Sequence, residues 1–383
     1  MPHRQHITTM PATREPASLL TVDRAVFELR RGRIVAIAAH GGARALVMAA
    51  EGIMESTLSD LRAMAGGEPH LALTRRRAEV LDLCPRDLGA PAVVALDLGG
   101  LDAETVLRYA DPMSDNPTAV VKPAVTDINR HGPESAAIGL AKIARLLPAA
   151  LVVTLDDPDS ADLAAWTARR NLALVDAGDI FQYERTAAHT LKRVSEARVP
   201  LEDAERTRII AYRPQDGGLE HLAIVIGEPE PHAQPLVRLH SECFTGDLLG
   251  SLRCDCGDQL RGAIQAIAKD GAGVLLYLAQ EGRGIGLVNK LRAYTLQDRG
   301  VDTLDANEQL GYDADERVYL PAAEMLKDLG LRRVRLLTNN PDKVSALTQF
   351  GIDVAERVAH AFPSNKHNEQ YLLTKKAKGG HLF

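Results

Sequence analysis

The stretch Arg238-Leu-His-Ser-Glu-Cys-Phe-Thr-Gly-Asp-Leu-Leu-Gly-Ser-Leu-Arg-Cys-Asp-Cys-Gly-Asp-Gln259 decides how this chain is interpreted. It contains three of the four cysteines of the protein, Cys243, Cys254 and Cys256, in the spacing C-x10-C-x-C. Thiols at this density in a reducing compartment indicate a metal site before they indicate a disulfide. Zinc is the expected ion, because it is borderline-soft and takes sulfur ligands in a tetrahedral arrangement.

The number of cysteines bears on the kind of metal site. A structural zinc site has four protein ligands, and His240 or His221 would have to be the fourth one here. Three thiolates alone leave one coordination position for water or substrate, which is the catalytic arrangement. Free buried cysteines are a third alternative. The hydrogen-bonding side chains crowded around the cysteines favour the catalytic alternative, because a structural site does not need them.

Length and composition restrict the class of protein. A chain of 383 residues is long enough for two domains, and 45% hydrophobic with 25% charged residues is ordinary for a soluble globular protein. A net charge of −6 argues against a general nucleic-acid-binding surface, whereas a phosphate-bearing small substrate needs only local positive charge. No apolar run reaches membrane-spanning length, and residues 1–16 do not resemble a secretory signal. We therefore expect a cytoplasmic protein without a membrane or nucleic-acid partner.

Strands and helices alternate in the first half of the chain, which predicts an α/β domain over residues 20–190. Residues 1–19 are expected to be a disordered polar tail, and the charged segment 191–205 a linker. Cys84 is predicted to be a buried apolar residue. The main predicted elements are helices over 22–31, 101–109, 135–147 and 159–170, and strands over 33–39, 45–49, 149–154 and 172–175.

The second half predicts another α/β domain over residues 206–383. Strands over 206–212 and 222–226 form a hairpin, and a strand over 235–239 leads into the cysteine stretch. An amphipathic helix over 258–269 and a buried strand over 274–279 follow. A further helix covers 287–299, and Leu336-Leu-Thr-Asn-Asn-Pro-Asp-Lys343 ends a strand and caps a helix that begins at Pro341. Such a strand-to-helix turn is a ready anion site.

The loop Gln280-Glu-Gly-Arg-Gly-Ile-Gly286 has the composition of a phosphate-binding segment. Glycines let the backbone approach a phosphate while the arginine neutralises its charge. Taken alone, the same loop fits a helix-capping turn. Likewise Tyr294 fits ordinary helix packing, and Gly311-Tyr-Asp-Ala-Asp-Glu-Arg317 fits a solvated loop. The cysteine stretch nearby favours the functional interpretation of the glycine-rich loop.

Together these motifs closely resemble GTP cyclohydrolase II, the zinc enzyme that opens the guanine ring of GTP at the start of riboflavin synthesis. The resemblance covers about residues 200–383. It implies that GTP is the substrate and that formate and pyrophosphate are released. It also implies a zinc ion held by the three cysteines, Mg²⁺ bound with the GTP phosphates, and a homodimer.

The same resemblance implies roles for individual residues. Asp315 matches a proton acceptor, Arg317 matches the group that engages the α-phosphorus, and Tyr294 matches an active-site tyrosine suited to proton transfer. Glu242 is a second candidate for proton transfer. The implied substrate contacts are Arg238, Leu239, His240, Ser241, Glu242, Gln259, Glu281, Gly282, Arg283, Thr303, Thr338 and Lys343.

The first half resembles 3,4-dihydroxy-2-butanone 4-phosphate synthase in framework pieces, namely 28–33 and 171–175 with Asp179. That family has an acidic cluster after its first strand, but residues 37–44 contain no carboxylate. Gly132-Pro-Glu-Ser135 stands where the family has Gly-His-Thr-Glu, so Pro133 replaces a metal-binding histidine although Glu134 is kept. We therefore expect a scaffold without synthase chemistry. The alternatives are a bifunctional enzyme, a paralogue acting on another nucleotide, and a non-catalytic zinc module.

Overall fold

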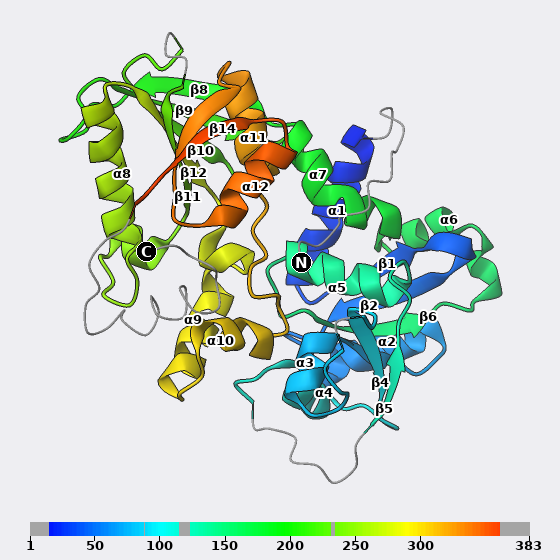
Figure 1. Ribbon diagram of the computed structural model, residues 1–383. Helices are drawn as coiled ribbons and strands as arrows, with labels where there is room; N and C mark the ends of the chain where they lie inside the picture. Colours follow the sequence, from blue (N-terminus) through cyan, green and yellow to red (C-terminus); the bar gives the residue numbers. More distant parts are fainter. Residues whose placement is uncertain (1–14, 88, 115–122, 231–233, 361–383) are drawn as a thin grey trace.

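The chain forms two α/β domains, each built on one mixed sheet (Figure 1). The computed structural model describes residues 15–87, 89–114, 123–230 and 234–360. Within these ranges each sheet has seven strands. The predicted fold class is therefore confirmed. The basic C-terminal tail, which belongs to the predicted domain 206–383, lies outside the described residues from 361 onward.

The N-terminal sheet is antiparallel except where β1 pairs with β7, and its strand order is β5-β4-β3-β6-β2-β1-β7. A short turn over His40–Gly42 joins β1 to β2, so these neighbours form a hairpin instead of a crossover. The strands are β1 Val35–Ala38, β2 Arg44–Ala49, β3 His70–Thr74, β4 Val93–Asp97, β5 Ala124–Asp127, β6 Ala149–Thr154 and β7 Ala173–Asp176.

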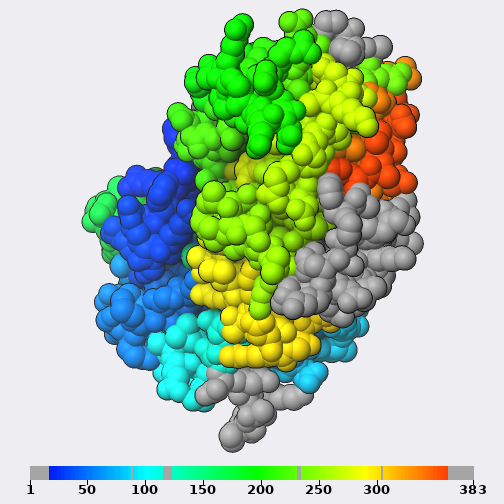
Figure 2. Space-filling model, turned by 90° about the vertical axis from the view of Figure 1, so that its left-hand side faces the viewer, coloured from blue at the N-terminus to red at the C-terminus, as the bar shows by residue number. Residues whose placement is uncertain are grey.

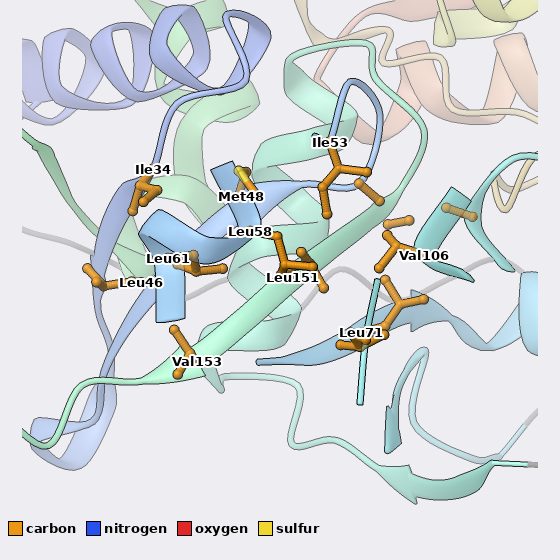
Figure 3. Packing of buried hydrophobic residues seen from close by; sticks show 14 of the residues in the cluster. Ile34, Leu46, Met48, Ile53, Leu58, Leu61, Leu71, Val106, Leu151 and Val153 are labelled. Carbon is orange, nitrogen blue, oxygen red and sulfur yellow. The ribbon is translucent and has the colours of Figure 1, made fainter. Parts of the chain in front are cut away.

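Helices cover both faces of this sheet, and each face has its own apolar core. Residues of α1, α5 and α7 pack on one face, and residues of α2, α3, α4 and α6 pack on the other. Figure 3 shows part of the second core, where Leu58 and Leu61 of α2 meet Leu46, Met48 and Leu151 of the sheet. The helices are α1 Glu15–Arg30, α2 Glu55–Ala65, α3 Arg75–Val80, α4 Ala103–Ala110, α5 Pro133–Ile143, α6 Leu163–Arg169 and α7 Ala177–His189.

Two predicted boundaries are wrong. Helix α1 begins at Glu15, inside the segment predicted to be a disordered tail, because Leu19 is buried and Val22 packs in the core on the sheet. Burying such a side chain stabilises the folded state by about 1.5–3 kcal/mol, so the helix forms although the neighbouring residues are polar. The predicted linker 191–205 contains the strand β8 Lys192–Arg198, which pairs antiparallel with β9. An edge strand with exposed charged side chains has a composition similar to that of a linker.

The second sheet has the order β14-β13-β11-β12-β10-β9-β8. The strands from β14 to β12 in this order are mutually parallel, and those from β12 to β8 pair antiparallel, so β12 belongs to both parts. The predicted hairpin is β9 Thr207–Arg213 with β10 His221–Ile226. The remaining strands are β11 Leu236–Ser241, β12 Gly273–Leu278, β13 Arg333–Leu337 and β14 Asp353–Val358.

Helix α8 Cys256–Asp270 packs on one face of this sheet, and α11 Leu320–Asp328 with α12 Pro341–Gln349 on the other. Helices α9 Leu287–Asp298 and α10 Thr303–Gln309 extend instead towards the N-terminal domain (Figure 1). There, Ile285, Leu296 and Tyr312 share an apolar cluster with Leu147. In the space-filling view the yellow residues of this region lie against the cyan and blue N-terminal domain (Figure 2). The segment between β12 and α11 therefore joins the two domains.

The parallel strands position the candidate site. The carboxyl ends of β11, β12 and β13 lie at one edge of the sheet, where ligands of open α/β sheets usually bind. Cys243 follows β11, Glu281 follows β12, and Thr338 follows β13. Motifs that are far apart in the sequence therefore converge at this edge.

No helix among the described residues has both the length and the apolar character needed to cross a bilayer.

Candidate active site

The three cysteines of the C-x10-C-x-C stretch meet at the edge of the sheet. Their sulfur atoms all lie within 4.8 Å of one another, and Cys243 Sγ is 3.8 Å from Cys254 Sγ. A tetrahedral zinc with Zn–S bonds of about 2.3 Å would hold its sulfurs about 3.8 Å apart. A Cβ added at Gly246 would lie 2.8 Å from Cys254 Sγ and 3.1 Å from Cys243 Sγ, so only glycine leaves room for the cluster. The donor atoms therefore fit a sulfur-ligated metal ion.

Neither histidine proposed as a fourth ligand of a structural site faces the thiols. His240 Nε2 lies 3.0 Å from both carboxylate oxygens of Asp247, and its ring stacks on Tyr277 at a centroid distance of 5.5 Å. His221 Nδ1 accepts a hydrogen bond of 3.0 Å from the Ala279 amide. Among the described residues, the candidate metal cluster contains the three cysteines alone. A metal ion held by these three ligands would have one coordination position left for water or substrate.

Lys290, which sequence reasoning missed, contacts the thiol of Cys243 directly. Its buried ammonium donates hydrogen bonds to Cys243 Sγ at 3.0 Å, Thr245 Oγ1 at 2.9 Å and Glu281 Oε1 at 2.9 Å. Hydrogen bonds from Cys254 and Cys256, followed by the charge of Lys290, lower the pKa of Cys243. Lys290 precedes Tyr294 by four residues on α9, so the expected active-site position of Tyr294 already indicated that Lys290 shares its face.

Tyr294 lies beside the cysteine segment. Its hydroxyl is 3.4 Å from Thr245 Oγ1, and its ring lies under the Arg253 guanidinium at 4.9 Å from the ring centroid. Burial raises the pKa of Tyr294 above its usual value, so the phenol holds its proton at neutral pH. Burial, followed by the charge of Glu281, also raises the pKa of Glu242. Both groups line the same pocket as the thiols.

This pocket, with a volume of about 150 Å³, is markedly cationic. Six basic side chains line it, together with two carboxylates, Glu242 and Glu281. Such a charge balance suits a polyanionic substrate. The six are Arg238, Arg253, Arg283, Lys290, Arg317 and Lys343.

Arg238 is the most deeply buried of these arginines. Its guanidinium donates to the Leu337 carbonyl at 2.9 Å and to the side chain of Gln259, while Nε has no partner among the described residues. Burial lowers the pKa of Arg238 to about 10, which still leaves it charged at neutral pH. A buried donor without a partner is costly, so a group that accepts its hydrogen bond would be favoured here.

The glycine-rich loop brings Arg283 into the pocket and keeps Glu281 within the protein. Both oxygens of the buried Glu281 carboxylate are used: one accepts from the Phe244 amide at 2.6 Å, and the other from Lys290 and the Gly282 amide. Gly282 and Arg283 have left-handed φ angles of 64° and 65°. For arginine this conformation costs about 1–3 kcal/mol, a strain typical of functional loops.

The segment 313–317 lies beside that loop. The Glu316 amide donates to the Arg283 carbonyl at 3.0 Å, and Arg283 Nη1 donates to the Ala314 carbonyl at 3.2 Å. Arg317 lines the pocket, whereas Asp315 is not among the lining residues and accepts the Arg317 Nε hydrogen bond at 2.8 Å. Although burial alone would raise it, the Arg317 charge lowers the pKa of Asp315 below its usual value. Asp315 is therefore ionised and orients Arg317.

The remaining predicted contacts differ in position. Thr338 and Lys343 line the pocket after β13, and Lys343 Nζ donates to the Leu239 carbonyl at 2.8 Å. The Leu239 side chain is buried in the core and does not line the pocket. Ser241 lies in the pocket and accepts from Gln280 Nε2 at 3.1 Å. Thr303 begins α10, but its side chain lies outside the described part of the chain. Besides Lys290, the lining residues that sequence reasoning did not propose are Arg253, Ile285, Ala293, Gln297, Asn307, Asn339, Asn340 and His360.

The fold and the site together define a class of protein: an α/β protein in which three thiols that could hold a metal ion lie beside a cationic pocket. The family model for GTP cyclohydrolase II matches residues 192–359. A GTP cyclohydrolase-2 of Azospirillum brasilense is 53% identical over 374 residues, which are 96% of this chain and 95% of that protein. The chain belongs to the GTP cyclohydrolase II family.

The similarity extends through the N-terminal domain. The riboflavin biosynthesis protein RibBA of Aquifex aeolicus is 35% identical over 404 residues, covering 97% of this chain and 99% of that protein. The crystal structure of RibBX, a two-domain 3,4-dihydroxy-2-butanone 4-phosphate synthase from A. baumannii, is 19% identical, with a TM-score of 0.36 over 89% of this chain and 99% of that one. Because the RibBA alignment spans both halves, the predicted pair of domains has counterparts in riboflavin biosynthesis proteins.

Proposed function

We propose that this protein is a zinc-dependent GTP cyclohydrolase II for the first step of riboflavin biosynthesis. It would hydrolyse GTP to 2,5-diamino-6-(5-phosphoribosylamino)pyrimidin-4(3H)-one, formate and pyrophosphate. In this reaction water cleaves both C–N bonds at C8 of guanine, so that C8 leaves as formate, and it cleaves the bond between the α- and β-phosphates. The observation that carries the proposal is a pocket that combines three thiols with six basic side chains.

Cys243, Cys254 and Cys256 would hold the zinc ion, which supplies Lewis acidity that activates water near neutral pH. Lys290 supports the cluster by donating to Cys243 Sγ at 3.0 Å. Hydrogen bonds to a ligand orient it and tune its donor strength, so Lys290 belongs to the chemistry of the site. Glu281 completes the arrangement because it ties Lys290 to the backbone of Phe244.

The basic side chains would bind the triphosphate. Arg283, Arg317 and Lys343 come from three separate loops and line one pocket, so they could neutralise charge on successive phosphates. Mg²⁺ carried by the phosphates would add to this neutralisation. Asp315 holds the Arg317 guanidinium in one orientation, which favours contact of that guanidinium with the α-phosphorus group.

Proton transfer at the opened ring would fall to Tyr294 and Glu242. The Tyr294 phenol is protonated at neutral pH and lies next to Thr245, close to the thiols. The raised pKa of Glu242 brings this carboxyl closer to the range of a useful base. Tyr294 would therefore act as the proton donor and Glu242 as the proton acceptor.

A direct assay tests the proposed function. The purified, zinc-loaded protein is incubated with GTP and Mg²⁺, and formate, pyrophosphate and the diaminopyrimidine are measured. One formate and one pyrophosphate for each GTP are expected, with ATP as the nucleotide control. Stable binding of zinc without formate release would reject the enzyme and favour a non-catalytic zinc module.

Replacing Tyr294 by Phe should slow formate release by about 100- to 10,000-fold, because that is the usual contribution of a positioned proton donor. Zinc content and unfolding temperature should stay at the wild-type values, since the hydroxyl makes one hydrogen bond at 3.4 Å. Tyr212→Phe is the matched control, because its hydroxyl donates to Asp328 at 2.6 Å and Tyr212 is not among the residues that line the pocket. An unchanged formate rate in Tyr294→Phe would reject the role.

The N-terminal domain should have no 3,4-dihydroxy-2-butanone 4-phosphate synthase activity. That chemistry requires carboxylates to bind Mg²⁺ and to move protons. Residues 37–44 supply none, and Glu134 pairs instead with His70 at 3.2 Å. Ribulose 5-phosphate and Mg²⁺ should give neither formate nor butanone phosphate with the full-length protein. Product at enzymatic rates would instead establish a bifunctional enzyme. The homodimer and the cytoplasmic location remain predictions.

A further inference from the structure

The end of helix α5 in the N-terminal domain touches both loops that carry the expected phosphate-binding arginines. Arg145 Nη2 donates to the Ala279 carbonyl at 2.7 Å, directly before the loop 281–286. Lys142 Nζ donates to Glu316 Oε1 at 2.6 Å, inside the segment 313–317. Lys142 lies in the last turn of α5 and Arg145 lies two residues beyond its end, so this one short segment reaches both loops.

The Arg145 contact is tightly specified on both sides. Its backbone has a left-handed φ of 58°, a conformation that is costly for a residue other than glycine. Its carbonyl accepts from Asn289 Nδ2 at 3.0 Å, which fixes it to the start of α9. A Cβ added at Gly286 would lie 3.0 Å from Arg145 Cδ, so the loop passes directly against the arginine side chain.

The Lys142 contact acts on the residue between Asp315 and Arg317. Glu316 Oε1 accepts from Lys142 and also from the Asp313 amide, at 2.7 Å. The Glu316 amide in turn donates to the Arg283 carbonyl at 3.0 Å. Through the Glu316 carboxylate, Lys142 therefore helps to fix the position of Arg283 relative to Arg317.

A cavity lies behind these loops. It has a volume of about 520 Å³ between the two domains and is lined by Gln280, Gly284 and Glu316 from one side and by residues of α1, α5 and α7 from the other. Side chains that border a cavity receive little support from apolar packing. The hydrogen bonds from Lys142 and Arg145 are therefore a main constraint on this side of the loops.

We propose that Lys142 and Arg145 are positioning residues of the cyclohydrolase site, contributed by the N-terminal domain. They would act through the backbone of Ala279 and the carboxylate of Glu316, and neither lines the candidate active-site pocket. The N-terminal domain would thus set the spacing of the two arginine-bearing loops. This inference rests on the proposed function for its kinetic test alone.

The test uses the full-length, zinc-loaded protein with Arg145→Ala, Arg145→Lys and Lys142→Met. In Arg145→Ala and Lys142→Met, kcat/KM for GTP should fall roughly 10- to 100-fold, because small displacements of positioned groups have effects of this size. The zinc content should not change. Amide hydrogen exchange should become faster in 281–286 and 313–317, and Arg145→Lys should restore part of both properties.

Tyr183→Phe is the matched control. It removes another polar contact between the domains, the 2.5 Å hydrogen bond from Tyr183 to Asp216, which lies in the turn between β9 and β10. Wild-type kinetics and wild-type exchange in both loops are expected for this variant. An equal loss in Tyr183→Phe would overturn the proposal in favour of general domain docking. Unchanged loop exchange in Arg145→Ala and Lys142→Met would also overturn it, whether or not the wild-type protein turns over GTP.

Discussion

Cys256→Ser should remove both the zinc and the cyclohydrolase activity of this protein. Cys256 is the first residue of α8, and its sulfur completes the cluster with Cys243 and Cys254. A serine hydroxyl is a much poorer zinc ligand than a thiolate, and the two remaining thiols would leave the ion underligated. Loss of residues that merely support a metal ligand costs about 10- to 100-fold, so loss of a ligand itself should exceed about 100-fold in activity.

Metal analysis and formate release should be measured on the same preparations. Cys84→Ser is the matched control, because Cys84 is the fourth cysteine and packs at the edge of the N-terminal core. It should keep one zinc per chain and wild-type turnover. Gly246→Ala gives an independent check, since its added methyl would press on Cys254 and Cys243 and should lower zinc retention. Stoichiometric zinc with full turnover in Cys256→Ser would disprove the ligand assignment.

Arg317→Ala should lower kcat for GTP by about 100- to 1000-fold, the usual effect of removing a group that stabilises charge in a transition state. The Arg317 side chain is 14% exposed, lines the pocket and is held by Asp315 at 2.8 Å. Asp315→Ala should produce a loss of similar size, because Arg317 would lose the partner that orients it. If Asp315 is instead the proton acceptor matched by the resemblance, its loss should persist in Asp315→Asn, which keeps a hydrogen-bonding group.

Both variants should fold and bind zinc as the wild type does, because the pair lies at the pocket rather than in a core. Their zinc content and unfolding temperature should be measured beside the rate. Arg333→Ala is the control, since Arg333 forms an exposed ion pair with Asp353 at 3.3 Å in the same domain. Exposed pairs contribute at most about 1 kcal/mol, so this variant should be nearly silent. Near-normal turnover in Arg317→Ala or Asp315→Ala would show that the segment 313–317 is a solvated loop without a role in the reaction.

Local sequence patterns determined much of the fold. The hairpin of β9 and β10, the helices α8 and α12 and the buried strand β12 all lie where periodicity and turn residues predict them. The C-x10-C-x-C spacing predicted a three-thiol cluster, and the sulfurs do meet. These predictions succeeded because hydrophobic period, capping and ligand spacing are written over a few consecutive residues. Where the local composition was ambiguous, as in α1 and β8, sequence reasoning failed.

Only the tertiary structure decided which side chains line the pocket together and which are instead used in hydrogen bonds within the protein. The Glu281 carboxylate accepts hydrogen bonds from Phe244 and Lys290, and His240 is held by Asp247. The sequence motifs of Glu281 and His240 do not reveal these partners. The contacts of Lys142 and Arg145 join residues more than 130 positions apart in the chain. The sequence by itself specifies helices, strands and turns, because these depend on local interactions. The close approach of distant loops depends instead on how two separately formed sheets pack, and that packing is a property of the whole folded chain.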